Sequence, residues 1–247
     1  LVDKAIKTGM PAIALTDHGC MYGIKELRDY CKKANKKLKE KAVESGTEYV
    51  PFKPIVGVEA YCARRSRLQH DKALKAVNAE GRTYIVDQSG WHLILLAKNM
   101  QGYRNLCRIV SASFMEDSYY RRPRIDRDLL EEYHEGLICT SACVAGYLAQ
   151  CIKSGKLDQA EKYLRKMVDI FGDDFYIEIQ PYSITEPGLQ EKVNVESIKL
   201  AKKLGIKLIL TSDSHRGAKE DFDTYMKMHE VAKHNFDDIE ATYKERY

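Results

Sequence analysis

The sequence lacks the long apolar runs that mark membrane proteins. No stretch approaches the ~18 consecutive apolar residues of a membrane span, and no basic segment followed by an apolar one opens the chain. These absences argue against a membrane partner and against secretion. We therefore expect a cytoplasmic protein.

Paired cysteines and an excess of one charge are lacking as well. The seven cysteines include no C-x-x-C pair, and an odd number spread over 247 residues argues against a disulfide scaffold. Free thiols fit a reducing compartment. Lys and Arg number 40 against 36 Asp and Glu, and the resulting net charge of +4 is too small to indicate nucleic-acid binding by itself.

Three catalytic signatures are also absent. No G-x-x-x-x-G-K-[ST] occurs and no G-x-G-x-x-G follows a strand, so a nucleotide phosphate cradle is unsupported. No G-x-S-x-G elbow is found either. Cys143 could act as a nucleophile with a histidine partner, but no local motif marks it as one.

The sequence does contain a regular alternation of short apolar runs and amphipathic stretches. Strands are predicted at 12–16, 55–62, 92–97, 136–140, 175–180 and 207–211. Helices are predicted near 22–37, 99–115, 126–133, 143–153, 157–171, 187–204 and 219–234. Strands separated by helices predict parallel β–α units, and more than five of them favour a closed or nearly closed barrel.

Two segments depart from this alternation. The chain opens directly on a helical pattern that Gly9 ends, and a sequence that starts in mid-helix without Met is expected to be a fragment of a longer protein. The segment 63–90 is long, polar and basic. We expect it to be an insertion, either mobile or a β-hairpin arm, which contacts a polyanion or is simply solvated.

Metal-ligand residue types gather at the ends of the predicted strands. They are Asp17, His18, Glu59, His92, Cys143, Asp213 and His215. In β/α barrels the strand ends form one face, so such residues converge, and even six of these seven exceed the four ligands of one tetrahedral ion. Each residue alone has a plainer explanation. Asp17–His18 could end a strand, His92 precedes its strand and could be a core histidine, and Cys143 could simply be buried.

Several segments, taken in order, resemble the motifs of one family. "GMPAIALTDHGCMYG" is similar to the second motif of the PHP (polymerase and histidinol phosphatase) superfamily, and "PFKPIVGVEAYCA" is similar to its third. "LLAKNMQGYRNLCRIVSASF", "YYRRPRID", "EGLICTSACVAGYLAQ" and "FYIEIQPY" continue the likeness over nearly the whole chain. The stretch ending in "YYRRPRID" resembles the members carried by bacterial DNA polymerase III α subunits rather than the free-standing phosphatases.

The resemblance implies a fold and a set of metal ligands. The family fold is a distorted (β/α)7 barrel, which makes residues 1–247 a single PHP domain with an insertion near 63–90. Its first motif, a His-x-His followed by an acid, would lie before Leu1, so the fragment is expected to lack the first strand and three ligands. Matched to this sequence, the remaining ligands are His18, Glu59, His92, Cys143, Asp213 and His215.

The resemblance also implies a chemistry. Two to three divalent ions (Zn, Mn or Fe) bridged by a carboxylate such as Glu59 would hydrolyse a phosphoester, including 3′–5′ removal of nucleotides. Asp17 would be a supporting catalytic residue that orients His18. In "TSDSHR", Ser212 and Arg216 stand where polymerase members usually have Asn and Tyr. Arg216 would then meet a substrate phosphate or point to solvent.

In the polymerase branch, the parent protein would be a DNA-directed DNA polymerase. Its Mg²⁺ would be bound by palm-domain carboxylates outside these residues. DNA, the sliding clamp and a proofreading subunit are the implied partners. Two alternatives stay open: a free-standing PHP phosphoesterase of the histidinol-phosphatase type, and a non-catalytic scaffold that binds metal for stability or docks a partner.

Overall fold

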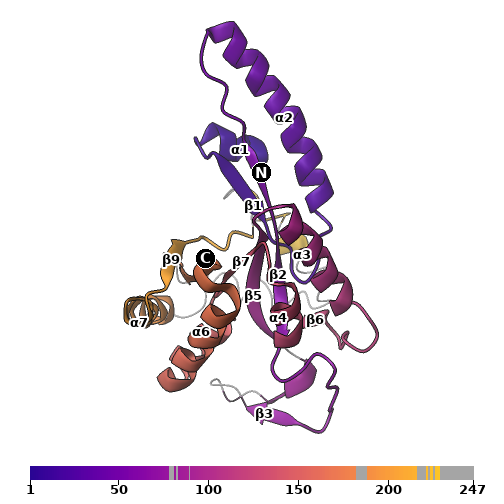
Figure 1. Cartoon of the computed structure of the whole chain (residues 1–247), viewed down its shortest axis with the longest axis vertical. Helices are drawn as coiled ribbons and strands as arrows, with labels where there is room; N and C mark the ends of the chain where they lie inside the picture. Colours follow the sequence, from indigo (N-terminus) through magenta and orange to yellow (C-terminus); the bar gives the residue numbers. More distant parts are fainter. Residues whose placement is uncertain are drawn as a thin grey trace.

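The computed structural model describes residues 1–77, 81, 83–88, 90–181, 188–215, 221, 223–224 and 226–228 (Figure 1). Its main sheet contains β1 (Ala12–Leu15), β2 (Lys53–Ala63), β5 (Gly90–Ala97), β6 (Arg124–Ile125), β7 (Leu137–Thr140), β8 (Phe175–Ile179) and β9 (Lys207–Leu210). The helices are α1 (Val2–Lys7), α2 (Ile24–Ser45), α3 (Met100–Ser113), α4 (Arg127–Tyr133), α5 (Tyr147–Lys153), α6 (Leu157–Phe171) and α7 (Leu189–Leu204). Short 3-10 turns, η1 (Val86–Gln88) and η2 (Gly172–Asp174), precede β5 and β8.

One strand of the sheet runs against all the others. The strand order is β1-β2-β5-β7-β8-β9, with β6 paired to β2, and β5 is antiparallel to both of its neighbours. The remaining pairs are parallel, so the prediction of parallel β–α units is wrong at β5. The reason is that the described residues between β2 and β5 form a hairpin and a short 3-10 turn but no α-helix. A parallel return needs a crossover connection, whereas this chain turns back and pairs directly.

The sheet curls into a half-barrel within a mixed α/β fold. Among the described residues, β1 and β9 are not hydrogen-bonded to each other, so the sheet stays open between its two edge strands. The side chains that follow these two edges nevertheless meet, as the contacts described below show. The curl therefore brings the residues that follow β1 and those that follow β9 to one site.

The predicted elements recur with small shifts at their ends. All six predicted strands are present. Helix α2 reaches Ser45 instead of ending near 37, because Ala34, Leu38 and Ala42 continue its apolar stripe through a lysine-rich stretch. It ends where Gly46 adopts left-handed backbone, with φ 65°. The helix predicted at 219–234 lies mostly outside the described residues.

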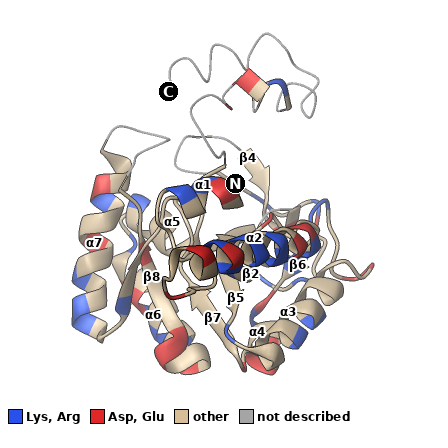
Figure 2. Cartoon of the chain, turned by 90° about the horizontal axis from the view of Figure 1, so that it is seen from above, with Lys and Arg blue, Asp and Glu red and all other residues tan. Residues whose placement is uncertain are grey.

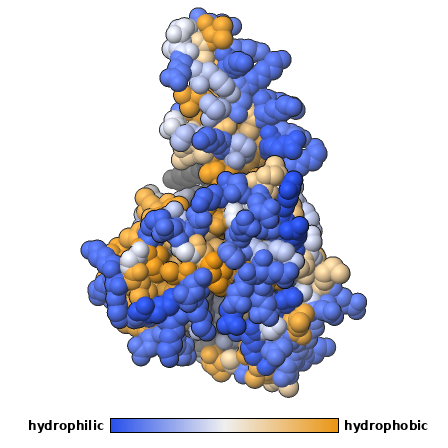
Figure 3. All heavy atoms as spheres, in the orientation of Figure 1, coloured by the Kyte–Doolittle hydropathy of each residue, from blue (hydrophilic) through white to orange (hydrophobic). Residues whose placement is uncertain are grey.

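Two apolar cores hold these elements together. The larger core lies between the sheet and helices α3 to α7, and the smaller one joins α1, β1, α2 and Phe52. Helix α2 rests on the smaller core and projects away from the sheet (Figure 1). The projecting part is covered mainly by hydrophilic side chains (Figure 3). This helix therefore contributes little to the site on the sheet beyond anchoring β1.

The mixed surface charge and the free thiols are those expected from the sequence. Acidic and basic residues are interspersed on α2, α6 and α7 (Figure 2). All seven cysteines are free, which confirms that no disulfide framework supports the fold. Within the described ranges, none of the helices combines the length and the apolar character that crossing a bilayer requires.

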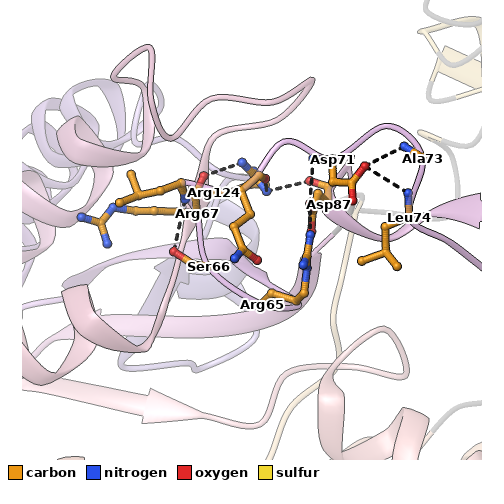
Figure 4. Close-up of polar contacts among 10 residues, drawn as sticks. Arg65, Ser66, Arg67, Asp71, Ala73, Leu74, Asp87 and Arg124 are labelled. Carbon is orange, nitrogen blue, oxygen red and sulfur yellow. Dashed lines mark hydrogen bonds and ion pairs between the residues drawn. The ribbon is translucent and has the colours of Figure 1, made fainter.

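The arm, which we define as residues 64–89, contains a hairpin of β3 (Lys75–Val77) and β4 (Thr83–Ile85). Its base is fixed by polar contacts (Figure 4). Arg65 Nε donates to the buried carboxylate of Asp87 at 2.9 Å. The guanidinium of Arg124, which is fully buried, donates to four backbone carbonyls, those of Arg67, Gln69, Asp87 and Ser118. These bonds tie the described part of the arm to β6.

Candidate metal centre

The chain leaving β1 runs along the edge of β2, which places His18 beside Glu59. The backbone nitrogen of Glu59 donates to Asp17 O at 3.0 Å, and that of Gly19 donates to Glu59 O at 2.8 Å. As a result, His18 Nδ1 lies 3.4 Å from Glu59 Oε2. Gly19 has φ +65°, and a Cβ atom there would lie 2.7 Å from Pro123 Cγ, so the turn after His18 requires glycine.

The reversed direction of β5 explains how His92 reaches the same place from the start of its strand. His92 pairs with Tyr61, two residues beyond Glu59 on β2. Because side chains two residues apart share a face, His92 and Glu59 are diagonal neighbours across the strand pair. His92 Nδ1 contacts Glu59 Oε1. In a wholly parallel sheet His92 would have been at the opposite end.

Two loops supply the remaining donors. After β7, Cys143 Sγ lies 3.6 Å from His92 Nδ1 and 3.9 Å from Glu59 Oε1. After β9, His215 Nε2 lies 3.4 Å from His18 Nε2. Asp213 precedes His215 by two residues in the same loop and lies near enough to Cys143 for its charge to raise the pKa of that thiol. We call these six residues the rim cluster: His18, Glu59, His92, Cys143, Asp213 and His215.

The backbone of both loops is unusual for the residues that carry it. Ala142 has φ 59° and Asp213 has φ 48°, which is left-handed backbone for residues other than glycine. Such conformations cost about 1–3 kcal/mol each and gather at functional sites. The backbone conformations that position Cys143 and Asp213 therefore lower the stability of the two loops.

The separations within the rim cluster suit transition-metal ions. His18, Glu59 and His92 offer ligand atoms that all lie within 4.8 Å of one another. Two nitrogens on one tetrahedral Zn²⁺, each about 2.0–2.1 Å from it, lie about 3.3 Å apart, and a sulfur and a nitrogen lie about 3.6 Å apart. The His18–His215 and Cys143–His92 separations of 3.4 and 3.6 Å match these values. The imidazole, carboxylate and thiol donors present therefore fit divalent ions of the Zn, Mn and Fe group.

The shifts in pKa favour the metal-binding form of Glu59 and of His18. Burial alone would raise the pKa of Glu59, but the hydrogen bond from His92 and the nearby imidazoles hold it below its usual value. Burial lowers the pKa of His18, although the charge of Glu59 opposes this. Glu59 is thus ionised and His18 neutral at neutral pH, which are the forms that bind metal.

The other two acidic groups behave in the opposite way. Burial, followed by the charge of Glu59, raises the pKa of Asp213. Burial and Asp213 raise the pKa of the Cys143 thiol well above its ordinary value. A thiolate at Cys143 therefore requires a neighbouring positive charge such as a metal ion.

Two predicted residues stand apart from the rim cluster. The carboxylate of Asp17 accepts a hydrogen bond from Gly23 N at 3.0 Å, so it closes the loop that carries His18. Its predicted role in orienting the His18 ring stays a prediction. Arg216 lies outside the described residues.

Comparison with known proteins identifies the family. The family model described as "PHP domain" matches residues 1–182, well over half of the chain. The chain belongs to the PHP domain family. The six residues of the rim cluster include four, His18, Glu59, His92 and Cys143, that lie inside the matched range.

The PHP domain is also similar to curated proteins named DNA polymerase III subunit alpha. It is 39% identical over 221 residues to that of Borreliella burgdorferi, which covers 90% of this chain and 17% of the relative. The corresponding protein of Thermus aquaticus is 38% identical over 90% of this chain and 15% of the relative. The corresponding protein of Treponema pallidum is 37% identical over 90% of this chain and 16% of the relative. The chain thus spans about one sixth of the length of these relatives.

A buried polar network beside the rim cluster was missed by the sequence analysis. Glu178 on β8 is only 8% exposed and accepts hydrogen bonds from Thr140, from Thr211 (2.6 Å) and from Gln180 (3.3 Å). Burial raises the pKa of Glu178. The signal was available, because Glu178 stands between two isoleucines of a strand and an unpaired carboxylate there would cost several kcal/mol. Glu59 was found by the same reasoning.

Proposed function

We propose that this PHP domain is a metal-dependent phosphoesterase of a DNA polymerase III α subunit, acting on DNA 3′ ends. Its metal ligands are His18, Glu59, His92, Cys143, Asp213 and His215, and they hold at least two divalent ions of the Zn, Mn or Fe group. The observation that carries the proposal is the placement of Glu59. Its two carboxylate oxygens face different donors, Oε2 toward His18 and Oε1 toward His92 and Cys143.

The residues of the rim cluster divide the work accordingly. Glu59 would bridge an ion at His18 Nδ1 and an ion at the His92–Cys143 pair, whereas His18 Nε2 faces His215, and the low pKa of Glu59 keeps it charged at neutral pH. The Gly19 turn and the two left-handed loop residues fix the donors before any ligand arrives. Divalent ions held there would supply Lewis-acid activation of water and of a phosphoester. Asp17 supports the site by holding the 18–23 loop closed.

The relatives favour the polymerase setting over a free-standing phosphatase. Proteins named DNA polymerase III subunit alpha are similar to 90% of this chain. In that setting the whole protein is a cytoplasmic DNA-directed DNA polymerase that uses Mg²⁺ elsewhere, and it works with DNA, a sliding clamp and a proofreading subunit. The chain then forms a single PHP domain of distorted (β/α)7 type, with an insertion at 63–90.

Metal content and nucleotide release test this proposal together. Purified protein should hold two or more ions per chain by mass spectrometry and release nucleotides from the 3′ end of single-stranded DNA. Glu59→Gln should lose both properties, whereas Glu161→Gln on α6, which pairs with Arg165 and Lys203, should lose neither. Fewer than two bound ions would overturn the catalytic proposal. Two ions without nucleotide release would indicate a scaffold, and release of phosphate from small monoesters alone would indicate the histidinol-phosphatase type.

A further inference from the structure

A basic cavity lies between the arm and the loop before β6. It has a volume of about 560 Å³ and is lined by Lys75, Thr83, Tyr84, Ile85, Gln88, Gly90, Arg121 and Arg122. Three of these side chains are cationic and none carries a carboxylate. The lining cations are exposed, so an anion can reach them from solvent.

The cavity wall is built by specific contacts. Arg64 stacks on the rings of Tyr84 and Trp91, at 4.5 and 3.4 Å from the two centroids, which holds β4 against β5. Arg121 adopts left-handed backbone with φ 60°. In an extended strand adjacent side chains point to opposite faces. The turn at Arg121 breaks that alternation, and both Arg121 and Arg122 therefore line one cavity.

The same cavity adjoins the rim cluster. The guanidinium carbon of Arg122 lies 4.7 Å from the ring centroid of Tyr61. That ring is 5.4 Å from the ring of His92 and 6.1 Å from the ring of His18. Gly90, at the cavity wall, precedes His92 by two residues on β5, a separation of about 7 Å along a strand. One aromatic ring thus separates the basic cavity from two of the proposed ligands.

We propose that this cavity binds an internal phosphate of single-stranded DNA whose 3′ end lies in the rim cluster. Arg121, Arg122 and Lys75 contact the phosphate. This inference rests on the proposed function and deepens it, because it names the residues that bind the DNA strand upstream of its 3′ end. A lone phosphate would leave most of a 560 Å³ cavity empty. A nucleotide unit offers a phosphate to the cations and a base to Tyr84, as expected where basic grooves carry aromatic side chains.

Binding without metal tests the cavity separately from catalysis. Fluorescence anisotropy of a labelled five-nucleotide thymidine strand, measured in a chelator, would compare three proteins. They are the wild type, Arg121→Gln with Arg122→Gln, and a control in which Lys162→Gln and Arg165→Gln remove the same charge from α6. We expect the Arg121/Arg122 variant to raise the Kd at least tenfold and to reduce the magnitude of the salt slope by about 1.4, for two lost contacts. The control should stay within twofold.

The outcomes separate the cavity from the metal site. Equal weakening by both double variants, or none by the Arg121/Arg122 variant, would overturn the proposal. So would competition by inorganic phosphate as strong as that by the unlabelled strand, since the cavity would then bind a lone anion. The metal content of the Arg121/Arg122 variant should match that of the wild type. If the wild type holds fewer than two ions but still binds the strand through Arg121 and Arg122, only the catalytic proposal fails.

Discussion

His18 and His215, 197 positions apart in the sequence, bring their Nε2 atoms to 3.4 Å from each other. His18 follows the first strand of the sheet and His215 follows the last, so this contact spans the opening between the two edge strands. The separation is that of two ligands on one tetrahedral ion. An ion bound by both residues would link the two edges of the half-barrel.

This pairing predicts a pattern of metal loss. His18→Asn and His215→Asn should each remove one ion per chain, and the double variant should remove no more than either single variant, because both residues hold the same ion. His18→Asn combined with Cys143→Ser should remove two ions, since those residues belong to different pairs. Metal content by mass spectrometry after gel filtration measures this. Loss of two ions from the His18/His215 double variant would contradict the pairing.

Gly19 should be far less tolerant of a side chain than Gly9. Both residues have left-handed backbone, with φ +65° and +79°, but a Cβ atom at Gly9 has nothing within 4 Å, whereas one at Gly19 meets Pro123 and Tyr61. Gly9→Ala should cost about 1 kcal/mol for backbone strain alone. Gly19→Ala should cost about 2 kcal/mol or more and lower the metal content. Urea unfolding measures the loss of stability in each variant. Similar losses of stability for Gly9→Ala and Gly19→Ala would show that the contact with Pro123 is unimportant.

Glu178 predicts a pH-dependent difference between two substitutions. Its pKa is raised above 4.5 by burial, so the folded chain binds this proton more tightly than the unfolded chain does. Its contribution to stability is therefore complete at low pH and is lost as the pH rises through the raised value. Glu178→Gln, which mimics the protonated group, should gain stability over the wild type as the pH rises from 4.5 toward neutrality.

Glu178→Ala is the contrasting variant. It leaves the buried Thr140 and Gln180 without their acceptor and should cost about 1–3 kcal/mol at every pH. Thermal unfolding in a chelator between pH 4 and 8 measures both variants without interference from metal. A constant difference between Glu178→Gln and the wild type would show that Glu178 does not titrate in this range.

Arg124 should control the arm. Arg124→Met removes all the donors that serve the carbonyls of Arg67, Gln69, Asp87 and Ser118, and we expect a loss of about 3 kcal/mol. Amide exchange should accelerate in residues 66–74 while β7 and β8 keep their protection. Arg124→Lys retains a charge and part of the donors and should give an intermediate result. Uniform acceleration throughout the sheet would indicate a global effect instead.

The sequence predicted the strands and the ligand types well because both depend on local patterns. Apolar runs located each strand of the main sheet except the short β6, and a carboxylate between apolar residues marked Glu59. The direction of β5 could not be obtained in this way. Periodicity reveals that a strand exists, whereas its direction depends on the connection before it, and the arm had no clear pattern.

The rest of the site depends on contacts between distant segments. Nothing near Tyr61 or Arg122 in the sequence indicates that Arg122 reaches the ring of Tyr61, because the two lie on different strands and loops. The same holds for Arg124, because its partners are backbone carbonyls, which every residue type has. Such contacts follow from the way the sheet curls and the loops pack against it, which one sequence alone does not determine.

The reversed strand also has a consequence for engineering. Seven paired positions, from Gly57–Leu96 to Ala63–Gly90, fix the register of β2 against β5 independently of the residues that connect them. The arm therefore connects two strands whose pairing does not depend on the length of the arm. We expect an arm of another length to leave Glu59 and His92 in place, provided that it still offers carbonyl acceptors to the buried guanidinium of Arg124. Changes of substrate preference in such a scaffold can then be made without rebuilding the metal centre.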